Sequence, residues 1–150
     1  MPPPSLKYRI VHAVQQRALN PPIRFLLGHG LPAPGYVLLE TTGRRTGRSR
    51  RTPVGDGRVD GVLWIVAEHG ERAGYVRNIR ADPRVRVRLR DGWHEGVATV
   101  LPDDDARRRQ RWLARRRPAT ALNALVVRLM GTALTTVRVE LSGAAVSDAP

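Results

Sequence analysis

The chain has 150 residues, of which 41% are hydrophobic and 26% charged, a composition typical of one folded domain and not of a disordered chain. It lacks cysteine, which excludes disulfides, and its four scattered histidines predict no metal site; no apolar run approaches the ~20 residues of a membrane span. The net charge of +13 arises from 25 arginines and Lys7 against 13 acidic residues, and it should attract nucleic acid, anionic lipid or a small polyanionic ligand.

Residues 1–35 predict an N-terminal helical arm. Apolar residues recur at helical spacing within Leu6–Ala18, and Asn20-Pro21-Pro22 ends that helix. The arm does not begin with the basic-then-apolar order of a secretory signal, so we expect a cytoplasmic location. We expect the arm to pack across one end of its own domain, with contact of the helix to the inner face of a membrane as the alternative.

Six segments after the arm predict β-strands. They are Tyr36–Thr42, Arg51–Val54, Val62–Ala67, Arg84–Arg90, Trp93–Leu101 and Thr135–Leu141. Val62–Ala67 is continuously apolar and is expected to be buried, and the glycines and aspartates before it predict a hairpin. Arg84–Arg90 instead alternates, which places Val85, Val87 and Leu89 on one face and four arginines on the other.

Three further helices are predicted: Tyr75–Ala81, a helix from Asp103–Asp105 towards Arg117, and Ala119–Met130. The second is acidic at its start and basic along the rest, as the helix dipole favours, so its seven arginines need no ligand to explain them. The order of elements predicts an α+β fold in a single domain over residues 1–150: a small, mostly antiparallel barrel with peripheral helices.

The most specific segment is Thr41–Pro53, where five arginines surround Gly43 and Gly47. The glycines allow a tight turn and a close approach of backbone to ligand, and guanidinium groups suit two-pronged contacts with phosphate or carboxylate. The segment lacks the Gly-Lys-Ser/Thr ending of a nucleotide-binding P-loop. A charged hairpin turn is the alternative, but the mutual repulsion of five arginines would then be unrelieved.

The run Thr41-Thr42-Gly43-Arg44-Arg45-Thr46-Gly47 through Arg51-Thr52-Pro53 resembles the signature of the deazaflavin-dependent nitroreductase (quinone reductase) family. Ala67-Glu68-His69-Gly70 and Asn78–Val85 are similar to two later motifs of that family, and the order and approximate spacing agree over Tyr36–Leu89. The resemblance implies a split β-barrel that binds coenzyme F420, a deazaflavin with a phospholactyl-oligoglutamate tail.

The resemblance also implies the cofactor contacts. Arginines of the Thr41–Pro53 segment would bind the tail, the next residues would run beside the ring, and Ala67–His69 would place backbone against it. The full set is Gly43, Arg44, Arg45, Thr46, Gly47, Arg48, Arg50, Arg51, Thr52, Pro53, Val54, Ala67, Glu68, His69 and Asn78. His69 stands where related proteins often have lysine; a surface histidine without a role is the alternative.

The implied activity is transfer of hydride from the reduced cofactor to a small electron-poor acceptor such as a quinone, enone or nitro compound. Tyr75 and Val76 fall on the acceptor side, where Tyr75 is a wall of the pocket or a proton donor. Here the chain departs from the family, because Tyr75-Val76-Arg77 stands where tryptophan and further aromatics are common. The resemblance therefore does not identify the acceptor.

Alternative functions stay open. The chain could bind FMN or another ligand in the same fold, or carry its cofactor without catalysis. Each of these functions is compatible with a homodimer. A nucleic-acid binder is disfavoured because only 5% of residues are aromatic and no recognition motif is present.

Overall fold

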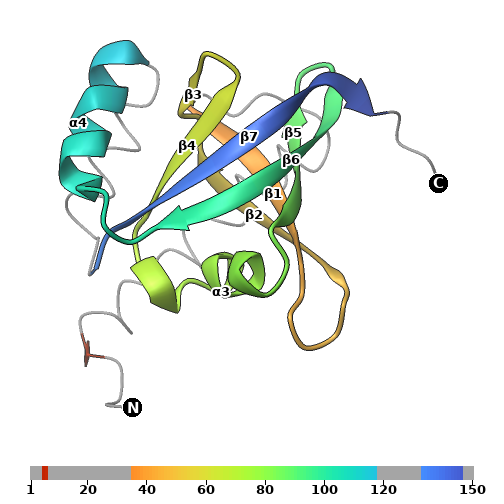
Figure 1. The fold of residues 1–150 in the computed structure, drawn as a ribbon, viewed down its shortest axis with the longest axis horizontal. Coiled ribbons are helices and arrows are strands. Elements are labelled where there is room, and N and C mark those ends of the chain that lie inside the picture. The colour runs from red at the N-terminus through yellow and green to blue at the C-terminus, as the bar shows by residue number, and fades with distance from the viewer. Residues whose placement is uncertain (1–4, 7–34, 118–132, 147–150) are drawn as a thin grey trace.

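The sheet of this protein contains seven strands, and each neighbouring pair is antiparallel (Figure 1). The structure is a computed structural model that describes residues 5–6, 35–117 and 133–146. The strands are β1 (Tyr36–Thr42), β2 (Ser49–Gly55), β3 (Arg58–Val59), β4 (Val62–Ala67), β5 (Arg84–Leu89), β6 (Gly92–Leu101) and β7 (Thr135–Val146). All six predicted strands are therefore confirmed, with β2 and β7 longer than expected.

The sheet curls because its two edge strands are consecutive in the chain. The spatial order is β2-β1-β5-β6-β7-β4-β3, yet only Asp56 and Gly57 separate β2 from β3. Both facts hold only if the two edges approach each other. The N–H of Trp64 in β4 donates to the Gly57 carbonyl at 3.0 Å, which extends the β3–β4 ladder back to the residue that follows Asp56. The predicted α+β split barrel is thereby confirmed as a curled half-barrel.

Alternation along the strands decides which side chains enter the half-barrel. In β5, Val85 and Val87 are buried and Leu89 packs against the core, while the arginines point to the other face, as predicted. The prediction that β4 is buried throughout was wrong for its outer face. There Trp64 is half-buried, because a helix covers it instead of a second sheet.

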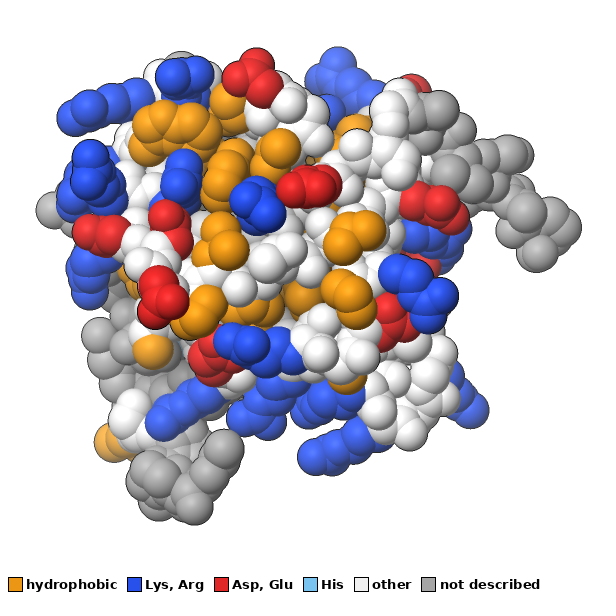
Figure 2. Space-filling model, in the orientation of Figure 1, with side chains coloured by type: hydrophobic (Ala, Val, Ile, Leu, Met, Phe, Trp, Pro, Cys, Tyr) orange, Lys and Arg blue, Asp and Glu red, His pale blue; other side chains and the backbone are white. Residues whose placement is uncertain are grey.

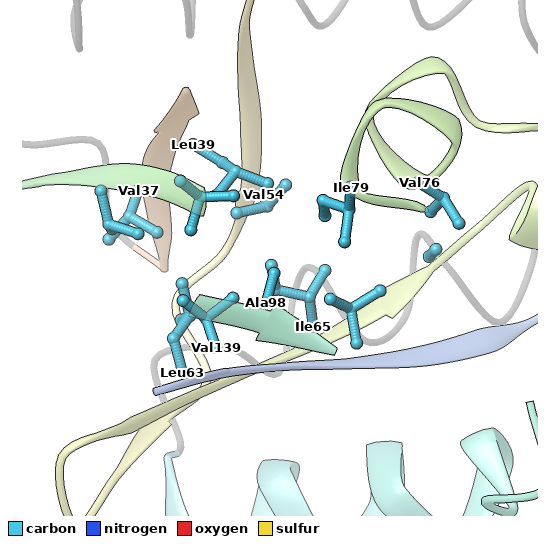
Figure 3. Packing of buried hydrophobic residues seen from close by; sticks show 13 residues of the cluster. Val37, Leu39, Val54, Leu63, Ile65, Val76, Ile79, Ala98 and Val139 are labelled. Carbon is cyan, nitrogen blue, oxygen red and sulfur yellow. The ribbon is translucent and has the colours of Figure 1, made fainter. Parts of the chain in front are cut away.

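The core fills the inside of the half-barrel. Side chains from β1 and β2 face those from β4, β6 and β7 across it, and Val76 and Ile79 of helix α3 (Gly74–Ala81) enter from one end (Figure 3). A short 3-10 helix, η2 (Gly70–Arg72), leads into α3. Because α3 closes this end, its remaining face is free to contact the neighbouring β1–β2 loop.

Helix α4 (Ala106–Arg116) lies outside β4 and β7. The Asp105 side chain accepts a hydrogen bond from the Arg108 N–H at 3.0 Å, which confirms the predicted acidic cap. Trp112 of α4 meets Trp64 edge-on, with ring centroids 6.0 Å apart. The predicted helices at Leu6–Ala18 and Ala119–Met130 lie outside the described residues apart from Leu6. Within the described part, no helix has the length and apolar character needed to cross a membrane.

Candidate functional site

The loop between β1 and β2 protrudes beyond the sheet, beside α3 (Figure 1). Its backbone closes on itself: the Gly43 N–H donates to the Arg48 carbonyl at 2.7 Å, and the Gly47 N–H donates to the Gly43 carbonyl at 2.8 Å. Gly47 has a φ of +69°, and a Cβ on Gly43 would lie 3.0 Å from the Arg48 carbonyl oxygen. Both glycines are therefore required by the shape of the loop.

One buried amide joins this loop to α3. The Oδ1 of Asn78 accepts hydrogen bonds from the Arg44 backbone N–H at 3.2 Å and from Arg44 Nη1 at 3.0 Å. The Nδ2 of Asn78 donates to the Thr41 hydroxyl at 3.1 Å. Asn78 thus holds the end of β1 and the start of the loop against the helix that closes the core.

A pocket of about 570 Å³ lies between the loop and the start of α3. Its lining consists of Gly43, Arg44, Arg45, Thr46, Ser49, Arg50, Arg51, Thr52, Gly74, Tyr75 and Asn78. Nine of these were predicted from the sequence, and they come from two motifs more than twenty residues apart. Ser49, whose hydroxyl the sequence offers as an additional polar contact of the arginine-rich run, and Gly74 were not among the predicted site residues. Nothing in the sequence marks Gly74.

The other predicted site residues lie elsewhere. Val54, Ala67 and Val76 belong to the hydrophobic core, and Val76 has no exposed surface, so its side chain offers nothing to a substrate. The reading of His69 as a surface residue was wrong, because its side chain is buried. Gly47, Arg48, Pro53 and Glu68 are at least partly accessible but do not line this pocket.

The arginines around the pocket differ in their partners. Among the residues that the structure describes, Arg45, Arg48 and Arg50 have no carboxylate partner. Arg51 does have one, since its Nε donates to Glu40 Oε2 at 3.0 Å. The expectation that all five repulsive charges are unrelieved was therefore wrong for Arg51.

Glu40 is buried and serves two arginines at once. Its second oxygen, Oε1, accepts from Arg86 Nε at 2.8 Å, and both guanidinium groups also lie 4.9 Å from the centre of the Trp93 ring. This cluster is on the outer face of the sheet, where Glu40 and Arg86 are cross-strand neighbours. Arg51 is thus partly neutralised by the fold, although it reaches the edge of the pocket.

Two other carboxylates in the described structure, Asp56 and Asp104, are also paired with arginines. Asp56 pairs with both Arg58 and Arg117, and Asp104 pairs with Arg109. Basic side chains surround the protruding β1–β2 loop on the face shown in Figure 2. Exposed arginines also occur on α4, but none of them lines this pocket. The pocket beside α3 therefore combines a concave site with unneutralised positive charge.

Residues 7–142 match the sequence model of the family described as F420H(2)-dependent quinone reductase. The chain belongs to this family. It is an oxidoreductase that uses coenzyme F420, as the resemblance of its motifs implied. No curated protein matches the chain.

Three solved structures of similar fold have low sequence identity to this chain, between 13% and 24%. The F420-H2 dependent reductase FDR-A is 24% identical, with a TM-score of 0.54 over 71% of this chain and 94% of its own. A chain described as a domain-swapped dimer is 20% identical, with a TM-score of 0.55 over 87% of this chain and 99% of its own. The heme storage protein HutZ from Vibrio cholerae is 13% identical, with a TM-score of 0.51 over 84% and 92%. These likenesses support the fold alone.

Among the described residues that line the pocket, Tyr75 is the one aromatic residue. Burial, and secondarily the negative charge of Glu68, raise the pKa of its phenol far above the ordinary value near 10. The hydroxyl therefore stays protonated at every pH at which the protein would be assayed. It can donate a hydrogen bond, but the raised pKa makes it a weaker acid than an exposed tyrosine, and it cannot serve as a base.

The different partners of Arg51 and Arg45 predict different effects on stability. Arg51→Ala removes an ion pair and a cation–π contact that are both partly exposed, so it should lower the free energy of unfolding by about 1 kcal/mol. Arg45→Ala, which loses no carboxylate partner, should change it by less than about 0.5 kcal/mol. Urea unfolding of both variants checks this. Equal destabilisation would contradict the division of the arginines.

Proposed function

We propose that the pocket between the β1–β2 loop and α3 binds coenzyme F420, with Arg44, Arg45 and Arg50 holding its anionic tail. The observation that carries this proposal is the composition of the lining, which, among the residues that the structure describes, includes four arginines and no carboxylate. In a pocket, such groups attract an anion more strongly than on an open surface, because the protein walls reduce screening by water.

The donor set fits the phosphate and carboxylates of the tail. The backbone N–H groups of Gly43, Arg44, Gly47 and Arg48 are already used within the protein, so the guanidinium groups are the main donors left in the loop. Guanidinium groups make two-pronged, charge-assisted hydrogen bonds to such oxygens. Arg48 lies outside the lining but on the same exposed loop, where a flexible tail could reach it.

The less charged part of the pocket wall is formed by Thr52, Gly74 and Tyr75. We assign the deazaflavin ring and the acceptor to this part, because an aromatic ring and an uncharged acceptor need cationic partners less than the anionic tail does. Pro53 and Val54 follow Thr52 in β2 and then support this part of the wall. Pro53 does so from outside the pocket lining, and Val54 does so from the core. Contact of the ring with the backbone of Ala67–His69 stays a prediction.

In its reduced form, the bound cofactor supplies a hydride for two-electron reduction. The protein's own part is to hold an electron-poor acceptor beside the ring and to assist protonation of the reduced oxygen. Tyr75 is placed to assist the second task by a hydrogen bond to that oxygen, since its protonated phenol lines the pocket, while solvent supplies the proton. Quinones, enones and nitro compounds all have an oxygen that can accept this hydrogen bond, so the description of the family as quinone reductases is what makes quinones the favoured acceptors.

Assembly and location remain predictions. A homodimer requires a second chain, and contact with a membrane surface would involve the N-terminal arm, most of which lies outside the described residues. A cytoplasmic location is likewise a prediction. None of them is needed for the cofactor site, whose lining comes from residues 43–52 and 74–78.

Loss of one tail-binding arginine should weaken binding only of ligands that carry the tail. Arg45→Ala or Arg50→Ala should weaken binding of full coenzyme F420 by roughly ten- to a hundredfold, the effect of one charge-assisted hydrogen bond of about 1.5–3 kcal/mol. A deazaflavin truncated before its phosphate should bind with unchanged affinity. Quenching of deazaflavin fluorescence measures both affinities.

Arg111→Ala is the matched control, because Arg111 is an exposed arginine of α4 outside the pocket. It should leave both affinities unchanged. A random oligonucleotide tests the other class of partner. If wild type binds the oligonucleotide tightly and the cofactor not at all, the proposed site is wrong.

Replacement of the Tyr75 hydroxyl should affect turnover more than cofactor binding. Tyr75→Phe keeps the ring in the wall but removes the hydrogen-bond donor to the reduced oxygen, so turnover of a quinone should fall by about a hundredfold. Because the phenol pKa is raised, wild-type turnover should show no alkaline loss from this group up to about pH 10. Steady-state kinetics across pH checks both. Full activity of Tyr75→Phe, with loss in Tyr75→Ala, would leave Tyr75 a wall only.

A further inference from the structure

Arg44 is held in a different way from most anchored arginines of this protein. Arg51 and Arg86 are fixed by Glu40, Arg58 and Arg117 by Asp56, and Arg109 by Asp104, so each shares its charge with a carboxylate. Arg44 is fixed by the neutral amide of Asn78. An amide restrains the guanidinium group as a carboxylate would, but it leaves the positive charge intact.

The orientation of that amide is determined by its partners. Both groups of Arg44 that contact it are donors, so the atom facing them must be the oxygen Oδ1. The nitrogen Nδ2 then faces the buried Thr41 hydroxyl, which can accept. Asn78 itself is 4% exposed and belongs to the helix that closes the core. The anchor is therefore rigid.

The anchor uses one end of the Arg44 side chain. Nη1 donates to Asn78, whereas Nε and Nη2 make no hydrogen bond to any described residue, and Arg44 lines the pocket. The Nε–Nη2 edge presents two parallel N–H groups, which match two oxygens of a phosphate. Arg45 and Arg50 line the same pocket without a comparable restraint.

We propose that Asn78 is a positioning residue that fixes Arg44 without neutralising it, so that the Nε–Nη2 edge of Arg44 binds the phosphate of the cofactor. This rests on the proposed function, because it requires the anionic tail to enter this pocket. It further divides the loop arginines: Arg44 is a rigid phosphate contact, and Arg45, Arg48 and Arg50 are mobile contacts for the carboxylates beyond it.

Two substitutions at position 78 separate positioning from charge. In Asn78→Asp, Arg44 and the Thr41 hydroxyl can still donate to position 78, so the loop keeps its place, but the new carboxylate neutralises Arg44. Binding of full coenzyme F420 should weaken about tenfold at low salt, and the difference from wild type should shrink as salt screens the charges. In Asn78→Ala, Arg44 keeps its charge but loses its restraint, so a similar loss should persist at all salt concentrations.

Controls use the truncated deazaflavin and double variants. Neither substitution should change binding of a deazaflavin that lacks the phosphate, whereas damage to the pocket as a whole would weaken it too. Asn78→Asp added to Arg44→Ala should cost less than about twofold further, because its effect acts through Arg44. Added to Arg45→Ala, it should cost the full tenfold.

The outcomes distinguish the two proposals. If neither Arg44→Ala nor Arg45→Ala weakens binding of the full cofactor, the loop does not bind the tail and the proposed function fails. If Arg44→Ala weakens binding but Asn78→Asp and Asn78→Ala bind like wild type, only the role of Asn78 is overturned. Circular dichroism establishes that each variant folds. Should Asn78→Asp not fold, Asn78→Ala decides, because wild-type affinity in that variant also overturns the role.

Discussion

The surplus of positive charge is the constraint on which the rest of this structure depends. With a net charge of +13, the chain has more guanidinium groups than carboxylates, so some arginines must remain unneutralised. Carboxylates that are buried or packed against the sheet, such as Glu40 and Asp56, pair with arginines from neighbouring elements and neutralise them there. The β1–β2 loop has no carboxylate of its own, and two of its three arginines, Arg44 and Arg45, line a pocket. The fold thus concentrates its surplus where an anionic cofactor can use it.

Helix α3 couples that pocket to the core. Val76 and Ile79 pack inside the half-barrel, while Tyr75 and Asn78, on its other face, reach the pocket and the loop. The helical repeat makes this division possible, because residues three positions apart share a face of the helix whereas adjacent residues do not. A site anchored in this way is restrained by the core, which is what a cofactor with a long flexible tail requires. The tail then meets at least one fixed contact among several mobile ones.

Much of the fold and part of the site could be predicted from the sequence. Strict alternation in β5 and the acidic cap of α4 are local patterns, and the structure bears them out. The faces of short segments were harder to predict. Val54 and Val76 adjoin ring-side motifs in sequence but point into the core, because strand register and helical phase, not proximity along the chain, decide direction. The pairing of Arg51 with Glu40 depends on the register of β1 against β2, which no local pattern reveals. The burial of His69 likewise depends on distant chain: a Cβ on the adjacent Gly70 would collide with the Ala133 carbonyl.

The central claim is that the arginine-rich loop, and not the rest of the basic surface, holds the anionic tail. NMR spectra of the arginine Nε–H groups, recorded while coenzyme F420 is added, test it most directly. The account predicts shifts at Arg44, Arg45 and Arg50. It predicts no change at Arg109 of α4, whose guanidinium group lies 4.0 Å from the centre of the Trp64 ring. Shifts along α4 with none in the loop would contradict it.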